Sequence, residues 1–395
     1  MNQPTMGSAP SSGRSRPQET AKEEILSRTV LITGGAGFIG AHLATQLLEQ
    51  GDRVRVLDSL HPQVHRDGQR PDYLPEDAEL VVGDVRDGDA VRKALVGVDR
   101  VAHLAARVGV GQSMYEISEY TSVNGVGTGV LLEALLDHPV ERLVVASSMS
   151  VYGEGLYLDA AGDPTPSIER RRGDLEQGRW EPQGPDGQQL TPVATPETKP
   201  PSLSSVYALG KYDQERLCLM FGAAYKVPTV ALRFFNAYGP YQALSNPYTG
   251  VLAIFASRLL NGRPPLVFED GEQKRDFVSV HDVARACALA LDAADAGGSV
   301  LNVGSGESIT VNEIAARLAR ILDKDIAPEV TGKFRVGDIR HCFADVSLAK
   351  DVIGYEPQVS LEQGMTELAA WLEGQVAVDD VDAATAELSS RGLTV

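Results

Sequence analysis

The chain has 395 residues, which is long enough to bury a large core and predicts two domains or one enlarged domain. Hydrophobic residues make up 43% and charged residues 23%, as is ordinary for a soluble globular protein. The formal net charge of −18 argues against nucleic acid and anionic membrane surfaces as partners, so an anionic ligand must be captured locally. No apolar run approaches the roughly 20 residues that a membrane-spanning helix needs.

The cysteines and the chain ends indicate a cytoplasmic protein with polar tails. Cys218, Cys287 and Cys342 are far apart in apolar or helical surroundings, and we expect buried free thiols rather than a disulfide or a metal set. Free thiols fit a reducing cytoplasm. Residues 1–27 begin with a stretch rich in Ser, Pro, Gly and Gln that lacks the apolar middle of a signal peptide, and they predict a disordered tail. Residues 373–395 predict an acidic helical tail on the surface.

The first strong motif is RTVLITGGAGFIG at residues 28–40, where a strand pattern gives way to glycines and then to a helical pattern. This order distinguishes a dinucleotide-binding loop from chance glycines. Gly34 permits the tight turn, Gly37 lets the backbone approach a pyrophosphate, and Gly40 lets the helix pack on the strand. The N–H groups at the helix start then bind the anion. Asp58 ends a second strand about 20 residues further on, where it can bind an adenosine ribose and favours NAD over NADP.

Strands and helices continue to alternate after this motif. The alternation predicts an α/β fold with a doubly wound parallel Rossmann sheet. Asp84 and Val85 follow the third strand, at the mouth of the sheet where an adenine ring could lie. Ala105 and Ala106 end the fourth strand, and their small size would let a flat ring or a ribose approach. Further strands are expected at 53–57, 79–82, 100–104, 142–147 and 229–234.

Three features stay open on the residue pattern alone. His61 and His65 could ligate a metal, but no supporting carboxylate or cysteine pattern accompanies them, so we favour an exposed loop. Asn124 lies in a helix expected over 118–136, and a solvated polar residue is an equal interpretation. Residues 155–202 are dense in Pro, Gly and charged residues, and they predict either a lid near the site or a flexible surface excursion.

A group that can move protons comes later in the chain. Tyr207 and Lys211 are four residues apart, hence on one face of a predicted helix, and Ser148 ends the fifth strand. A tyrosine near its ordinary pKa of about 10 is a poor base, but a nearby lysine and a positive nicotinamide ring favour the phenolate. Lys211 can also hydrogen-bond the nicotinamide ribose. The trio therefore predicts proton removal from a carbinol whose hydride passes to NAD+.

Over about residues 28–372 the chain resembles the extended short-chain dehydrogenase/reductase superfamily, through GGAGFIG, HLAA, SSMSVYG, YALGK, LRFFNAYGP, RDFV and RVGDIRH. Within it the chain is most similar to the nucleotide-sugar 4-epimerases, and among these to the dTDP-L-rhamnose 4-epimerases. The resemblance implies a homodimer with an NAD-binding Rossmann domain at 28–240 and a smaller mixed α/β nucleotide-sugar domain at 241–372. Segments near 275–303 would return to the first domain.

The resemblance also implies a role for each motif residue. Those implied to bind the cofactor are Gly34, Gly37, Phe38, Ile39, Gly40, Asp58, Asp84, Val85, Leu104, Ala105, Ala106, Asn124, Tyr207 and Lys211. The implied catalytic residues are Ser148, Tyr207 and Lys211. Those implied to contact the sugar nucleotide are Gly111, Gln112, Ser113 and Ser148 near the hexose, Phe268 at the base, and Asn236, Arg275 and Arg335 at the diphosphate.

Two departures from relatives narrow the expected chemistry. The related 4,6-dehydratases carry an acid pair directly after the catalytic Ser or Thr, whereas this chain has Met149 and Ser150, which argues against elimination and decarboxylation. The rhamnose epimerases tend to carry cysteine pairs in the insertion, whereas this chain has no cysteine from 153 to 217, so we expect no metal.

The hypothesis is an epimerase for dTDP-6-deoxyhexoses or UDP-hexoses that oxidises C4 transiently and returns the hydride to the opposite face. The alternative is another nucleotide-sugar enzyme of the superfamily: a 4,6-dehydratase, a decarboxylase, a one-way oxidoreductase or a 4-ketoreductase.

Overall fold

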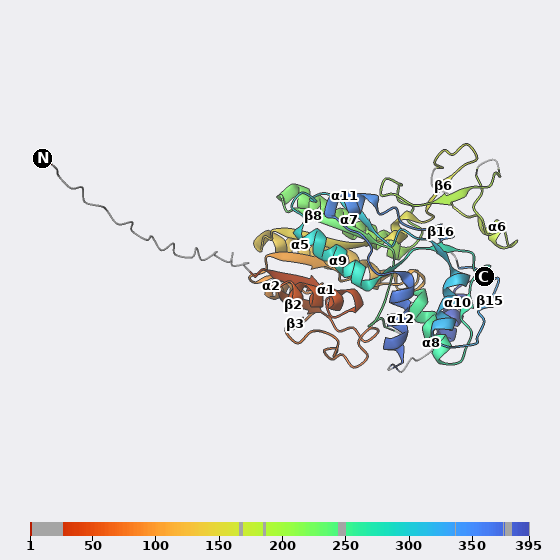
Figure 1. Cartoon of the computed structure of the whole chain (residues 1–395), viewed down its shortest axis with the longest axis horizontal. Coiled ribbons are helices and arrows are strands. Elements are labelled where there is room, and N and C mark those ends of the chain that lie inside the picture. Colours follow the sequence, from red (N-terminus) through yellow and green to blue (C-terminus); the bar gives the residue numbers. More distant parts are fainter. Residues whose placement is uncertain are drawn as a thin grey trace.

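A seven-stranded parallel sheet forms the larger part of the molecule (Figure 1). The computed structural model describes residues 1, 27–165, 169–184, 187–243, 250–335, 337–373, 375 and 381–394. The strand order is β13–β8–β5–β4–β1–β2–β3, and every neighbouring pair is parallel, which confirms the predicted Rossmann sheet. The strands are β1 (Thr29–Thr33), β2 (Arg53–Asp58), β3 (Glu79–Val82), β4 (Arg100–His103), β5 (Arg142–Ser148), β8 (Thr229–Phe234) and β13 (Val300–Val303).

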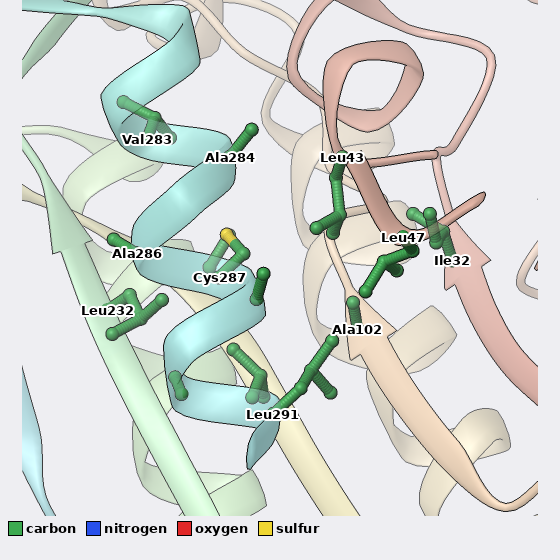
Figure 2. Close-up of a cluster of buried hydrophobic side chains, with 14 of the residues drawn as sticks. Ile32, Leu43, Leu47, Ala102, Leu232, Val283, Ala284, Ala286, Cys287 and Leu291 are labelled. Carbon is green, nitrogen blue, oxygen red and sulfur yellow. The ribbon is translucent and has the colours of Figure 1, made fainter. Parts of the chain in front are cut away.

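Helices cover both faces of this sheet. Because successive strand residues point to opposite faces, Val30 and Ile32 of β1 join one apolar cluster and Leu31 joins the other. Figure 2 shows the first cluster, where side chains from α1 and α9 meet those of β1, β4 and β8. The first face carries α1 (Phe38–Glu49), α9 (Val280–Asp292) and α11 (Ser347–Ile353). The second face carries α2 (Gly88–Leu95), α5 (Gly127–Asp137) and α7 (Val206–Tyr225).

The helix expected over 118–136 contains a wider turn. It consists of α4 (Ile117–Thr121), a π-helical turn η1 (Ser122–Val126) and α5, and the short α3 (Val110–Ser113) precedes it. Single π-helical turns occur frequently at functional sites. Asn124 lies in this turn and is fully buried, so the interpretation as a solvated residue is wrong. Its Oδ1 accepts a hydrogen bond from the Arg107 N–H at 2.7 Å and fixes the chain that follows β4.

A smaller set of elements packs around a third apolar cluster, formed largely by α8 (Val251–Leu260), α10 (Val311–Ile321) and α12 (Leu361–Leu372) (Figure 1). β9 follows β8 almost directly and pairs in parallel with β12, so this smaller unit joins the end of the large sheet. Its short strands are β9 (Asn236–Tyr238), β10 (Leu266–Val267), β11 (Lys274–Arg275), β12 (Phe277–Ser279), β14 (Ile309–Thr310), β15 (Glu329–Val330) and β16 (His341–Cys342).

The long insertion is anchored to the smaller unit. It follows a 3-10 turn η2 (Met149–Tyr152) and contains β6 (Leu156–Leu158), α6 (Arg172–Leu175) and β7 (Thr191–Val193), with β6 and β7 antiparallel. Arg170 Nη1 lies 2.7 Å from Glu269 Oε1, and Arg340 Nη2 lies 2.6 Å from Glu181 Oε1. These pairs argue against a free surface excursion, although residues 166–168 and 185–186 lie outside the described part.

The chain ends are described only in part. Residues 2–26, on which the predicted N-terminal tail falls, lie outside the described residues, as do 374, 376–380 and 395. The rest of the predicted acidic tail forms α13 (Val381–Ser390), whose Leu388 is only 6% exposed, so this helix packs against the protein.

Other local predictions can be compared with the structure. All three cysteines are buried and free, as predicted. His65 is buried, with Nε2 4.0 Å from Asp58 Oδ1, so its predicted place on an exposed loop is wrong. Of the helices in the described ranges, none is long and apolar enough to span a bilayer.

Candidate active site

The glycine loop between β1 and α1 has the geometry that its sequence predicted. Gly34 has φ +70°, and a Cβ there would lie 2.9 Å from Ala105 Cα, so the turn requires glycine. A Cβ on Gly40 would lie 2.5 Å from Gly35 Cα, which shows that helix and loop pack closely at this point. A Cβ on Gly37 would come near only the Gly34 carbonyl, at 3.3 Å, so the backbone at Gly37 stays approachable.

The other predicted cofactor residues lie at the carboxyl edge of the same strands. Asp58 ends β2, and its Oδ2 accepts a hydrogen bond from the Ala36 N–H at 3.0 Å, which ties the acid to the glycine loop. Asp84 follows β3 and pairs with Arg86 at 2.6 Å, and the hydrogen bond from Arg86 lowers the pKa of Asp84. Val85 beside it is buried.

Five more predicted cofactor residues surround this edge. Leu104 follows β4 and donates its N–H to the Thr33 carbonyl at 3.1 Å, and Ala105 next to it faces Gly34. Ala106 continues this segment, whereas Phe38 and Ile39 open α1. Strand order reverses between β1 and β4, and ligands of open α/β sheets bind in the crevice at such a point.

The predicted proton-transfer trio comes from β5 and α7. Ser148 ends β5 and is buried, and its hydroxyl lies close enough to Tyr207 to lower the pKa of that residue. Burial raises the pKa of Tyr207 overall, and the smaller effect of Ser148 opposes the rise. The predicted lowering of the Tyr207 pKa by Lys211 is therefore not present in this structure. Burial lowers the pKa of Lys211 to about 8.

Lys211 instead joins a buried polar network that the sequence reasoning missed. Its Nζ donates to Gln214 Oε1 at 2.7 Å, and Gln214 Nε2 donates to Thr128 Oγ1 at 2.9 Å. His103 connects Thr128 to Thr33 through bonds of 2.9 and 2.7 Å, and burial lowers its pKa to about 3. The sequence signal was available, because His103 and Gln214 are polar residues inside otherwise apolar stretches.

A buried ion pair fixes α7 to the sheet next to the trio. Glu215 follows Gln214 on α7, and both its oxygens accept hydrogen bonds from Arg233 of β8, at 2.9 and 2.7 Å. Ser147, which precedes Ser148, donates to Glu215 at 2.7 Å. Such a two-point contact fixes the distance of α7 from the sheet and its rotation about its own axis. This helix carries Tyr207 and Lys211.

The predicted hexose contacts lie on α3, beside the trio. Ser113 Oγ accepts the N–H of Tyr207 at 3.0 Å, so α3 lies directly against the start of α7. Gln112 is buried, and its side chain bonds Glu116 and Gln63, each at 2.9 Å. Gly111 is the second residue of this turn, and a Cβ there would lie 3.2 Å from Leu388 Cδ2.

The predicted diphosphate contacts gather at the smaller unit. Asn236 starts β9, and its Oδ1 is buried without a hydrogen-bond partner among the described residues, which leaves part of the amide for a ligand. Arg335 lies over the Phe268 ring, 4.5 Å from its centroid, and pairs with Asp338 at 3.0 Å. Arg275 donates to the carbonyls of Arg340, at 2.9 Å, and Ile339. Both arginines therefore have protein partners in this structure, and their phosphate role stays a prediction.

The insertion borders this region. A cavity of about 300 Å³ lies between the insertion and the 335–341 segment. Its wall includes Arg170 and Leu175 from the insertion and Arg335 and Asp338 from the opposite side. Glu154, at the start of the insertion, accepts the N–H of Arg340 at 2.7 Å and so holds the segment that carries Arg335.

Comparisons with known proteins agree with this arrangement. Residues 30–304 match the NAD dependent epimerase/dehydratase family. The chain is 39% identical over 350 residues to a dTDP-L-rhamnose 4-epimerase of Burkholderia thailandensis, covering 87% of this chain and 95% of that protein.

Two solved structures are also similar. UDP-glucose 4-epimerase of Thermotoga maritima with UDP-glucose has a TM-score of 0.72 and 30% identity, covering 87% of this chain and 98% of the other. UDP-glucose 4-epimerase of Thermus thermophilus in complex with NAD has a TM-score of 0.70 and 31% identity, covering 88% and 100%.

The chain belongs to the NAD dependent epimerase/dehydratase family. It is therefore an enzyme of the short-chain dehydrogenase/reductase type, and its cofactor is NAD. The residues present fit this cofactor, because Gly37 leaves backbone open at a helix start and Asp58 lies beside the loop.

Proposed function

We propose that the protein is a nucleotide-sugar 4-epimerase that inverts C4 of a dTDP-6-deoxyhexose or a UDP-hexose. The observation that carries the proposal is that Ser148, at the end of β5, acts on the pKa of Tyr207, while Lys211 follows on the same helix and the glycine loop lies at the same edge of the sheet. When bound, NAD supplies the group that accepts a hydride from C4 of the sugar and later returns it. Tyr207 removes the proton of the hydroxyl group on that carbon.

The residues of the chain divide the work between them. Tyr207 takes the proton from the sugar O4, and Ser148 shares a hydrogen bond with that oxygen. Lys211 keeps a positive charge below its pKa of about 8 and favours the tyrosinate once the ligands are bound. Since burial raises the pKa of Tyr207 in this structure, the tyrosinate would be favoured by the charge of Lys211 together with the positive ring that NAD+ supplies when bound.

Two observations favour an epimerase over a dehydratase. The residue after Ser148 is Met149, which is buried and cannot exchange protons. The Ser150 N–H donates a hydrogen bond to Ser148 Oγ at 3.1 Å and so orients the catalytic hydroxyl. The side chain of Ser150 is a hydroxyl and cannot serve as the general acid. Elimination of water would need a general acid at this place.

The B. thailandensis relative supports a dTDP-6-deoxyhexose as the first substrate to try.

We also propose a homodimer that pairs through α4, η1 and α7. Four apolar side chains on these segments are each more than half exposed: Ile117, Val126, Leu209 and Met220. The three free thiols support a cytoplasmic location.

Incubation with a panel of dTDP- and UDP-sugars, followed by NMR of the C4 stereochemistry, tests the proposal directly. A substrate carrying deuterium at C4 should keep its label in the epimerised product. Loss of the label to water, or a stoichiometric rise of reduced nicotinamide, would falsify the proposal in favour of another reaction of the family. Tyr207→Phe should abolish turnover.

A further inference from the structure

The C-terminal helix α13 and the residues after it lie across the predicted substrate side of the site. A methyl group on Gly111 would lie only 3.2 Å from Leu388 Cδ2, so the leucine packs directly on the α3 turn. The guanidinium of Arg391 lies 4.3 Å from the centroid of the Tyr115 ring. Thr394 forms an isolated antiparallel bridge with Arg335. Residues 388–394 therefore extend from the predicted hexose contacts to the predicted diphosphate contacts.

The start of α13 is fixed to α8 by charge. Asp382 accepts hydrogen bonds from Arg258 Nη1 and Arg263 Nη1, both at 2.8 Å. Arg258 is itself buried and donates through Nε to the Pro264 carbonyl at 2.7 Å, so its guanidinium is a rigid partner. The helix is thus held at its beginning by the smaller unit and near its end by α3.

The charges of α13 are compatible with a neighbouring diphosphate. The helix contains two carboxylates, Asp382 and Glu387. Asp382 is balanced by two arginines, and Glu387 accepts a hydrogen bond from Arg391 Nε at 2.8 Å. What the helix adds near Gly111 is the apolar side chain of Leu388, which carries no repulsive charge.

We propose that α13 and the residues after it, up to Thr394, form the outer wall of the nucleotide-sugar site, with Leu388 closing the sugar end and Thr394 closing the diphosphate end. This inference rests on the proposed function and adds a binding element outside the sequence motifs. The contacts of the wall fall on Gly111, Tyr115 and Arg335, and the first two lie in or next to the α3 turn, whose Ser113 accepts the Tyr207 N–H. A wall in this place excludes water from the sugar.

The test compares two added charges one residue apart in the full-length protein. Leu388→Asp places a carboxylate at the buried contact, whereas Ser389→Asp places the same carboxylate at an exposed position of the helix. Isothermal titration with dTDP-L-rhamnose and with UDP-glucose measures Kd for each variant. We expect Leu388→Asp to raise Kd about tenfold or more, because the buried leucine contact is lost. Ser389→Asp should stay within about twofold of wild type.

A second variant addresses the anchor. Asp382→Asn removes the charge that Arg258 and Arg263 hold, and it should also raise Kd, by about threefold. Unchanged affinity in Leu388→Asp, or tighter binding, overturns the inference, and tighter binding would mean that α13 blocks the site. Equal melting temperatures of Leu388→Asp and Ser389→Asp would show that the fold is intact.

The two proposals fail in different ways. If the wild type binds nucleotide sugars but does not invert C4, the proposed function is wrong and the Kd comparison still decides the role of α13. If the wild type inverts C4 and Leu388→Asp binds like wild type, the wall is wrong and the function stands. A wild type that binds no nucleotide sugar overturns both.

Discussion

Lys211 Nζ and Gln214 Oε1 are joined by a hydrogen bond of 2.7 Å inside α7, and both side chains are buried. Gln214 is in turn held by Thr128 and the Ala105 carbonyl, at 2.9 and 3.2 Å. The ammonium group thus has a fixed position relative to the strand end that borders the glycine loop. Gln214 is a positioning residue, because it acts through Lys211.

Replacement of Gln214 by Leu should lower kcat/KM about tenfold, because the lysine loses its fixed acceptor. The lost hydrogen bond favoured the charged lysine, so the pKa of Lys211 should fall further. The alkaline limb of the kcat/KM profile should then move to lower pH by about one unit. Gln214→Glu should move the same limb to higher pH. A limb that stays in place in both variants would show that Gln214 has only a packing role.

The burial of Lys211 should also appear in the pH dependence of stability. Burial lowers the pKa of Lys211 from the ordinary 10.5 to about 8, so between these values the native chain binds fewer protons than the unfolded chain. Stability contributed by this group therefore rises with pH across that window. The stability of wild type relative to Lys211→Met should increase by about 2 kcal/mol from pH 7 to pH 9.5, as measured by urea unfolding.

Lys93 provides the matched control for this experiment. It is an exposed lysine on α2. The difference in unfolding free energy between wild type and Lys93→Met should therefore stay constant over the same pH range. If the difference in unfolding free energy between wild type and Lys211→Met is also independent of pH, the buried ammonium is not desolvated in solution.

Replacing each of two glycines of one loop by alanine should affect different properties, stability in one case and NAD affinity in the other. Gly40→Ala places a methyl group 2.5 Å from Gly35 Cα and should destabilise the fold by about 1–3 kcal/mol. Gly37→Ala meets only the Gly34 carbonyl, so its melting temperature should stay close to wild type. Its affinity for NAD should nevertheless fall about tenfold or more, because the methyl group occupies the pyrophosphate approach.

Gly129→Ala controls for the general effect of a methyl group on a helical glycine. Nothing lies within 4 Å of a Cβ at this position of α5, so the variant should gain up to about 1 kcal/mol. Calorimetry and NAD titration of the three proteins separate stability from binding. Normal NAD affinity in Gly37→Ala would contradict the assignment of the loop.

The ion-pair network under the insertion should contribute to stability. Arg340 is 1% exposed and contacts Glu181 and Asp270, each at 2.6 Å, and Glu269 at 3.2 Å. Arg340→Met leaves the buried Glu269 with fewer partners and should cost about 3–5 kcal/mol. Limited trypsin digestion should then cut faster within the insertion.

Arg172 is the control for the network. It pairs with Glu176 at 2.9 Å on the surface of α6, and such exposed pairs contribute at most about 1 kcal/mol. Arg172→Met should therefore unfold like wild type. Similar stabilities of the two variants would show that the buried network does not hold the insertion.

The features predicted from the sequence were those encoded by neighbouring residues. The glycine loop, Asp58 and the Tyr207–Lys211 spacing each follow from a short motif, and the parallel sheet follows from alternating strands and helices. Contacts between distant segments could not be found this way. The Lys211–Gln214–Thr128 network depends on which face of α5 meets α7, and the π-helical turn at Asn124 leaves no clear periodicity.

The pKa shift of Tyr207 and the position of α13 could not be predicted from the sequence for a similar reason. The sign of the pKa shift at Tyr207 depends on burial, which a motif does not report. The position of α13 depends on a salt bridge to α8, more than a hundred residues earlier in the chain.

The chain leaves the large sheet after β8, forms β9 and α8, and then returns with α9 and β13 to the sheet. It departs again for α10, comes back with α11, and then adds α12 to the smaller unit. Neither unit is therefore a contiguous stretch of the gene. Recombination at a single breakpoint therefore cannot exchange the smaller unit as one cassette.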